Sequence, residues 1–113
     1  MLSGCSKPTV NLPNGYALHQ QEGAMIYLID KQGKRVIDKP VTQFFVCGEH
    51  MYGWIDKGEN GFFYLNTRTG ESDEYKRWAD LDAKTDKLQL PRLTMKDSLT
   101  YLDVISGYKN QTW

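Results

Sequence analysis

The chain has 113 residues, of which 40% are apolar and 25% are charged, and this composition is typical of one folded domain rather than a disordered segment. Its 14 basic and 14 acidic residues balance, so the composition provides no basic face for nucleic acid. No apolar run approaches the roughly 20 residues that a membrane-spanning helix needs. Any attachment to a membrane must therefore come from a lipid or a partner.

The first five residues carry a motif. Leu2-Ser3-Gly4-Cys5 resembles the lipobox of bacterial lipoproteins, in which an aliphatic residue and two small residues precede a cysteine. The resemblance implies that the Cys5 thiol carries diacylglycerol and that cleavage makes Cys5 the first residue of the mature protein, with further acylation on its amine. A precursor has a basic segment and an apolar stretch before this box, so we expect that the chain was cut just upstream of it.

The residues after the box predict a short tether. Residues 6–9 are polar or small and lead into the first apolar position, so we assign residues 1–9 to the lipobox remnant and tether. Several acyl chains would make the anchor durable, because each buried methylene contributes about 0.8 kcal/mol. Ser6 follows the cysteine where an aspartate would retain an enterobacterial lipoprotein at the inner membrane. The resemblance therefore implies the periplasmic side of the outer membrane.

Residues 10–75 predict a succession of short strands separated by strong turns, which is the pattern of an antiparallel meander. Gly70 is expected in the left-handed conformation that closes the last hairpin. The strands are expected at residues 16–19, 25–29, 35–37, 41–47, 51–55, 61–66 and 71–75.

Two stretches of this region resemble known β modules. The phrases that begin at Leu28 and Trp54 share an Ile-Asp-Lys turn and resemble the WG-type β repeat, although two copies are fewer than a solenoid or propeller needs. Gly53-Trp54 and residues 62–72 are similar to the middle of a WW domain, which binds proline-rich peptides on aromatic strands. The second signature tryptophan and the closing proline of that family are missing here. Shared turn chemistry is the alternative explanation of both likenesses.

The C-terminal third predicts one helix. Residues 76–93 are expected to form a long connection with at most one helical turn, from which Trp78 and Leu81 would face inward, and Pro91 excludes a helix through this segment. Thr94 is a good N-cap, and four apolar residues after it recur at helical spacing: Met95, Leu99, Leu102 and Ile105. We therefore predict a helix at residues 95–106 that packs on one face of the sheet and ends at Gly107.

These elements predict an α+β fold, in which an antiparallel meander-like sheet of about five to seven short strands carries the C-terminal helix on one face. Residues 10–113 are expected to form a single β-rich domain.

The sequence offers little catalytic chemistry. Cys47 and His50 lie three residues apart, but Cys47 ends an apolar run, and burial raises the pKa of a thiol, so a small Cys/His hydrolase is a minor alternative. His19 and His50 do not stand in a zinc-like spacing with a cysteine. We therefore predict no enzyme, no metal and no cofactor. A Cys5–Cys47 disulfide is an alternative to a lipidated Cys5 and a small buried Cys47.

Aromatic residues on neighbouring strands are the remaining candidates for a site. Alternation places one set of strand residues in the core, and the other face is either covered by the predicted helix or free to contact a partner. The candidate partner-binding residues are Tyr52, Trp54, Phe62 and Tyr64. We predict a lipid-anchored envelope protein that binds another envelope protein without catalysis. An immunity or phage-exclusion lipoprotein encoded by a mobile element is the alternative, since small size and the lack of catalytic residues fit it equally well.

Overall fold

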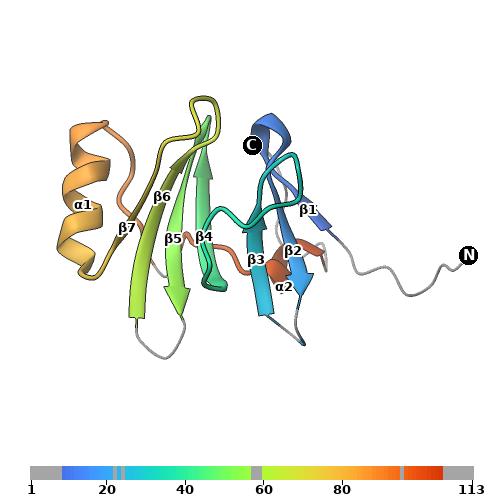
Figure 1. The fold of residues 1–113 in the computed structure, drawn as a ribbon. Coiled ribbons are helices and arrows are strands. Elements are labelled where there is room, and N and C mark those ends of the chain that lie inside the picture. The colour runs from blue at the N-terminus through green and yellow to red at the C-terminus, as the bar shows by residue number, and fades with distance from the viewer. Residues whose placement is uncertain (1–8, 22, 24, 57–59, 95, 106–113) are drawn as a thin grey trace, which may run out of the picture.

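The computed structural model describes residues 9–21, 23, 25–56, 60–94 and 96–105, which contain seven strands in two antiparallel sheets (Figure 1). The first sheet has the order β1–β2–β3, with β1 (Thr9–Asn11), β2 (Ala17–Gln21) and β3 (Met25–Ile29). The second has the order β4–β5–β6–β7, with β4 (Val41–Cys47), β5 (His50–Asp56), β6 (Asn60–Asn66) and β7 (Ser72–Tyr75). The helices are the short 3-10 turn η2 (Pro13–Gly15), α1 (Trp78–Lys87) and α2 (Tyr101–Ile105).

The elements form three layers. The β1–β3 sheet packs on one face of the β4–β7 sheet, and α1 covers the other face along β6 and β7 (Figure 1). Alternation along β6 shows why one sheet serves two cores: Phe63 and Leu65 point between the sheets, and Phe62 and Tyr64 point toward α1. The central strands are therefore apolar on both faces, as a sheet covered on both sides requires.

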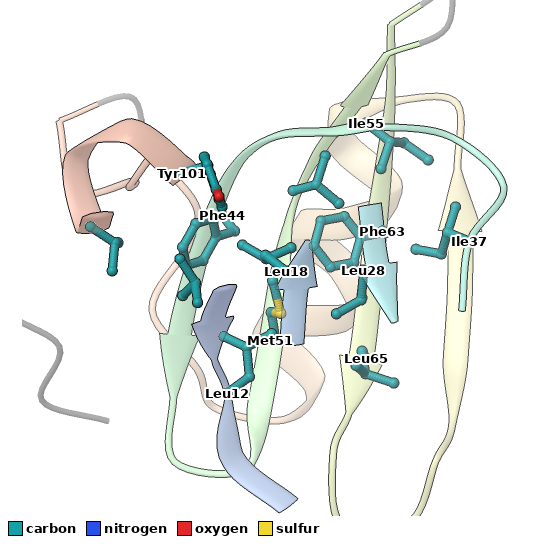
Figure 2. Packing of buried hydrophobic residues seen from close by; sticks show 13 residues of the cluster. Leu12, Leu18, Leu28, Ile37, Phe44, Met51, Ile55, Phe63, Leu65 and Tyr101 are labelled. Atoms are coloured by element: carbon teal, nitrogen blue, oxygen red, sulfur yellow. The ribbon is translucent and has the colours of Figure 1, made fainter. Parts of the chain in front are cut away.

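Figure 2 shows the larger core, where apolar side chains from both sheets interdigitate. Two segments close the gap between the sheets. Ile37, which follows β3, turns into the core and is buried. At the other side Leu99 exchanges two backbone hydrogen bonds with Phe44, at 2.8 and 2.7 Å, and α2 then adds buried apolar residues such as Tyr101.

The predicted fold class is confirmed, since the chain is α+β with an antiparallel meander and short strands close to the predicted positions. The strands divide into two packed sheets, a division that the strand pattern did not reveal. The predicted strand at residues 35–37 is wrong, because Arg35 makes only an isolated bridge with Ile29 before the chain crosses to the second sheet. β1 was not predicted; its three residues are too few to show a period of two.

The helix α1 corrects the prediction of a long connection at residues 76–93. The helix buries only Leu81 and Thr85 completely, so its apolar periodicity is weak. It ends before Pro91 in a Schellman motif, in which the Leu90 N–H donates to Thr85 O at 2.8 Å and Gln89 takes the left-handed conformation at φ 58°. Glutamine is an uncommon residue at this position, so the end of the helix was not predictable from the residues there.

The predicted helix at 95–106 is shorter than expected. Thr94 caps a turn, because its Oγ1 accepts the Asp97 N–H at 3.1 Å, but Leu99 is drawn into the bridge with Phe44. The helix α2 begins after Thr100, whose Oγ1 accepts the Asp103 N–H at 3.1 Å, and the Thr100 N–H donates back to the Asp103 carboxylate at 3.0 Å. This is a capping box with aspartate in place of glutamate. Met95 and Gly107 lie outside the described residues.

Candidate functional site

Three of the four predicted partner-binding residues are buried. Tyr52, Tyr64 and Phe62 expose 0%, 1% and 6% of their surfaces and form a second core with Leu81 of α1 and Leu93. This is the covered face that the alternation argument allowed, although α1 covers it rather than the predicted C-terminal helix. The expectation that these three side chains meet a partner directly needs correction, because they already pack against the chain itself.

Tyr52 is also tied down by its polar end. Its hydroxyl donates a hydrogen bond to the carbonyl of Pro91, in the segment that follows α1. Burial raises the pKa of Tyr52, and the nearby Cys47 thiol adds to the shift. A buried tyrosine needs such a partner for its hydroxyl. Tyr52 therefore fastens the segment after α1 to the sheet.

Of the four predicted partner-binding residues, Trp54 is the one whose side chain remains accessible to solvent. It lies against Trp78, which is also accessible. Trp54 is half-buried, and its ring meets the Trp78 ring edge to face, with centroids 4.9 Å apart. Phe62 lies beside both rings, 5.5 Å from Trp78 and 6.2 Å from Trp54. Trp78 exposes 38% of its surface, although the prediction turned it inward. We call Trp54 and Trp78, with Phe62 beneath them, the tryptophan patch.

A close backbone approach positions Trp54. A Cβ atom on Gly53 would lie 2.1 Å from the Gln43 carbonyl oxygen and 2.7 Å from the Phe44 Cα, so only glycine fits. The register of β4 against β5 shifts between Val41 and Gln43, and Gln43 pairs with Trp54 as a result. This irregularity accompanies the close approach of β4 to β5 at Gly53, one residue before Trp54.

Charged residues flank the helix side of the patch. Arg77 precedes Trp78 and is exposed, and its guanidinium nitrogens lie 3.3 Å from the Asp80 carboxylate oxygens. An exposed pair of this kind adds little stability. The pair with Asp80 therefore holds the Arg77 side chain only weakly.

Cys47 and His50 do lie side by side. They are the last register pair of the β4–β5 hairpin, and Cys47 is half-buried and free among the described residues. His50 Nδ1 lies 2.7 Å from the Tyr64 hydroxyl oxygen, so that nitrogen is engaged by a tyrosine. The Cys/His hydrolase stays a prediction without further support. Cys5 lies outside the described residues, as do the predicted lipidation and the Cys5–Cys47 disulfide.

A polar network occupies the same end of the second sheet, and the sequence reasoning missed it. Glu49 receives hydrogen bonds from Arg68 Nε at 2.9 Å and Asn66 Nδ2 at 3.0 Å, and these two donors, Arg68 first, lower the pKa of the carboxyl. Thr67 is buried and donates from Oγ1 to the Glu49 carbonyl at 2.8 Å. The network joins the β4–β5 turn to the β6–β7 loop. In the sequence, the one sign of this network was Asn66, which stands four residues before Gly70 and so indicates an Asx turn.

A second network joins α1 to β7. Lys84 Nζ lies 2.8 Å from Glu71 Oε2, 4.0 Å from Asp73 Oδ2 and 5.0 Å from the centroid of the Tyr64 ring. The hydrogen bond to Lys84 holds the pKa of Glu71 below its usual value, and the same bond raises the pKa of Lys84. Lys84 therefore places a positive charge on the ring of a buried tyrosine, a favourable arrangement.

The part of the chain that the structure describes contains no cluster of metal ligands and no membrane-spanning helix. The described His, Cys, Asp and Glu residues form no group of three that could hold a metal ion. No described helix is long and apolar enough to cross a bilayer.

The strands that resemble a WW domain lie in a different setting here. Gly53-Trp54 falls on β5, the aromatic run on β6 and the residues after Gly70 on β7, so the three form a meander. That meander has β4 beside it and is covered on both faces, by the β1–β3 sheet and by α1. Comparison with protein-family models, with curated proteins and with solved structures gives no match to the chain. Function must therefore be argued from the residues themselves.

Proposed function

We propose that this chain is a non-catalytic, lipid-anchored protein of the bacterial envelope, and that its domain binds a protein partner through the tryptophan patch. The observation that carries the proposal is the exposure of Trp78 and Trp54 beside aromatic residues that are almost completely buried. The anchor rests on the lipobox-like Leu2-Ser3-Gly4-Cys5. The two parts can be tested separately.

The position of the patch fits an anchored protein. Cys5 precedes the first residue of β1, Thr9, by four positions, and a chain spans at most about 3.6 Å per residue, so an acylated Cys5 lies within about 14 Å of β1. β1 belongs to the β1–β3 sheet, and α1 lies on the opposite side of the molecule (Figure 1). A membrane next to β1 would leave Trp78 on the side that faces the periplasm.

The chemistry of the patch suits a protein partner. Tryptophan and arginine are enriched among the few residues that dominate binding energy in protein interfaces, because they bury a large area and still offer a polar group. Trp78 and the preceding Arg77 provide this pair at the first turn of a helix that is fixed on the sheet. The rings are held by packing, so binding would cost little side-chain entropy.

Site-specific crosslinking tests the patch. A photo-crosslinking amino acid is placed at Arg77 in the full-length lipoprotein, expressed in its own host, and adducts are compared with and without Trp78→Ser. The matched control is Met25→Ser, because Met25 is also a strongly exposed apolar side chain and lies on β3 of the first sheet, away from the patch. We expect one dominant adduct that Trp78→Ser removes and Met25→Ser leaves. Equal adducts in both variants, with both folded by circular dichroism, would reject the patch.

The anchor has its own test. Cys5→Ser removes the thiol that would take the lipid, and we expect this variant to leave the membrane fraction while the domain keeps its thermal midpoint. A variant that stays in the membrane fraction would show that another feature holds the protein there.

A further inference from the structure

His50 and Tyr64 meet at the end of the second sheet. His50 is the first residue of β5 and faces Asn66 in register, and Tyr64 lies two residues before Asn66 on β6. The rings are 5.8 Å apart, and His50 Nδ1 lies 2.7 Å from Tyr64 Oη. His50 is partly exposed and Tyr64 is buried. Solvent protons therefore have access to the imidazole, and the phenol depends on the protein for its hydrogen bonds.

The neighbours of Tyr64 decide the direction of this hydrogen bond. The side-chain oxygen Oδ1 of Asn66 already accepts the backbone N–H groups of Arg68 and Thr69, at 2.9 and 3.1 Å, so the side-chain nitrogen Nδ2 is the group left to face Glu49 and the Tyr64 hydroxyl. Burial raises the pKa of Tyr64 and a hydrogen bond from Asn66 lowers it less, so the phenol keeps its proton at neutral pH. That proton points to His50 Nδ1, which must be unprotonated to accept it.

We propose that His50 is a pH-sensitive latch on α1: neutral His50 accepts the Tyr64 hydroxyl proton and fixes β6 beneath the helix, and protonated His50 releases that contact. An imidazolium ion carries hydrogen on both ring nitrogens, so His50 Nδ1 could no longer accept the phenol proton, and the Tyr64 hydroxyl would have to turn that proton to another acceptor. Histidine side chains are the groups that change charge between pH 5 and 8. The proposal goes beyond partner binding and does not depend on it.

Charged groups lie on both sides of the His50–Tyr64 contact. Glu49 precedes His50 in the adjoining turn, and Lys84 of α1 lies over the Tyr64 ring, 5.0 Å from its centroid. Glu71 on the β7 side pairs with Lys84, and the Cys47 thiol faces His50 from β4. The Glu49 charge is held by Arg68 and Asn66 in a partly exposed position, where solvent screens it. The loss of an acceptor by the buried phenol carries a free-energy cost that solvent does not screen in this way.

Tyr64 transmits the change to the helix. Its ring lies in the core cluster with Leu81, the most buried apolar residue of α1, and Lys84 of the same helix lies over the ring. A tyrosine whose hydroxyl loses its acceptor must rotate or admit water, and either movement disturbs both helix contacts. Local opening of α1 should therefore increase when His50 is protonated.

Hydrogen exchange of the full chain tests the latch. Amide protection of residues 78–87 is measured at pH 7.5 and pH 5.5 and corrected for the intrinsic exchange rates. We expect roughly three- to tenfold more opening of α1 at pH 5.5, which corresponds to one lost hydrogen bond. His50→Gln puts an amide oxygen, which does not titrate, in place of the imidazole acceptor, and Tyr64→Phe removes the hydroxyl proton. Both variants should therefore lose most of this pH effect.

His19 provides the matched control, because it is the other histidine of the chain and lies on β2 of the first sheet. His19→Gln should keep the full pH effect on α1. Equal protection at the two pH values in the unaltered protein would overturn the proposal. So would a pH effect that survives His50→Gln or disappears in His19→Gln. If His50→Gln does not fold, the unaltered protein and Tyr64→Phe still decide the outcome.

Discussion

Gly53 is the residue at which the smallest chemical change should have the largest effect on the fold. Replacement by alanine adds one methyl carbon, whose position would lie 2.1 Å from the Gln43 carbonyl oxygen, 2.7 Å from the Phe44 Cα and 3.0 Å from the Gln43 carbonyl carbon. All three atoms belong to the backbone of β4, so no side-chain rotation relieves the overlap. Two paired strands must move apart to accommodate the methyl group.

The cost follows from what must move. Overpacking of a core by one or two carbons costs about 1–3 kcal/mol when side chains can adjust. Here the β4–β5 pairing itself shifts, and Phe44 on one side of the contact is buried in the larger core. We therefore expect Gly53→Ala to lower the free energy of unfolding by about 3 kcal/mol or more, a large part of the roughly 5–15 kcal/mol that a domain has.

Gly61→Ala is the matched control, because Gly61 is also a strand glycine of the same sheet. Its Cβ would lie 3.2 Å from the Ile55 Cγ1, the nearest atom, and that side chain can adjust. We expect a change within about 1 kcal/mol, partly offset by the reduced freedom of the unfolded chain. Urea unfolding followed by tryptophan fluorescence measures both variants. Equal stability of Gly53→Ala and Gly61→Ala would refute the close approach of β4 to β5.

Three further predictions concern the helices and their charges. Gln89→Gly should raise the free energy of unfolding by about 0.5–1 kcal/mol in urea unfolding, because glycine adopts the left-handed conformation at φ 58° without a Cβ penalty; a lower stability would contradict the Schellman end of α1. Thr100→Ala should cost about 1 kcal/mol in the same assay, since it removes the N-cap of α2, and Thr100→Ser should restore most of it. The lowered pKa of Glu71 stabilises the fold above the unfolded-state pKa near 4.5, and this stability is lost as the pH falls through the folded-state value. Lys84→Met should therefore flatten the decrease in thermal midpoint between pH 5 and pH 3, and an unchanged slope would show that the Glu71–Lys84 pair contributes nothing.

The strands were predictable because their signals are local. Met25–Ile29 and Val41–Cys47 were predicted with the observed bounds, since β-branched and aromatic residues stand there between turn residues. The division into two sheets was not predictable, because the contacts of the core between the sheets join residues far apart in the sequence, among them Ile37 and Leu99. Each is a single apolar residue whose role is set by distant partners such as Phe44.

The helices were predicted less well for a related reason. α1 rests on a sheet that is already apolar, so two buried residues and a few aromatic contacts are enough to fix it, and a period of 3.6 hardly shows. In the C-terminal segment a helical spacing was present, but the backbone of Leu99 pairs with β4 instead. A long-range hydrogen-bond pair therefore overrides a local periodicity.

The candidate site was predicted in part. The aromatic concentration on β5 and β6 was visible in the sequence, and it identified Trp54, but three of its four members proved to be core residues. Trp78 was missed as a surface residue, since its neighbours gave no sign of which side of a helix it would occupy. The His50–Tyr64 contact was missed because the two residues are diagonal neighbours on adjacent strands, a relation that becomes clear only when the register is known.

The anchor on Cys5 is the part of the proposal on which the cellular role depends, and one measurement addresses it directly. The full-length protein is purified from the membranes of its own host, and the intact mass of the chain is determined. The proposal predicts a chain that begins at Cys5 and carries a diacylglycerol group with a further acyl chain. An unmodified chain that begins at Met1 would contradict the envelope proposal, and it would leave the tryptophan patch as a binding surface in another compartment.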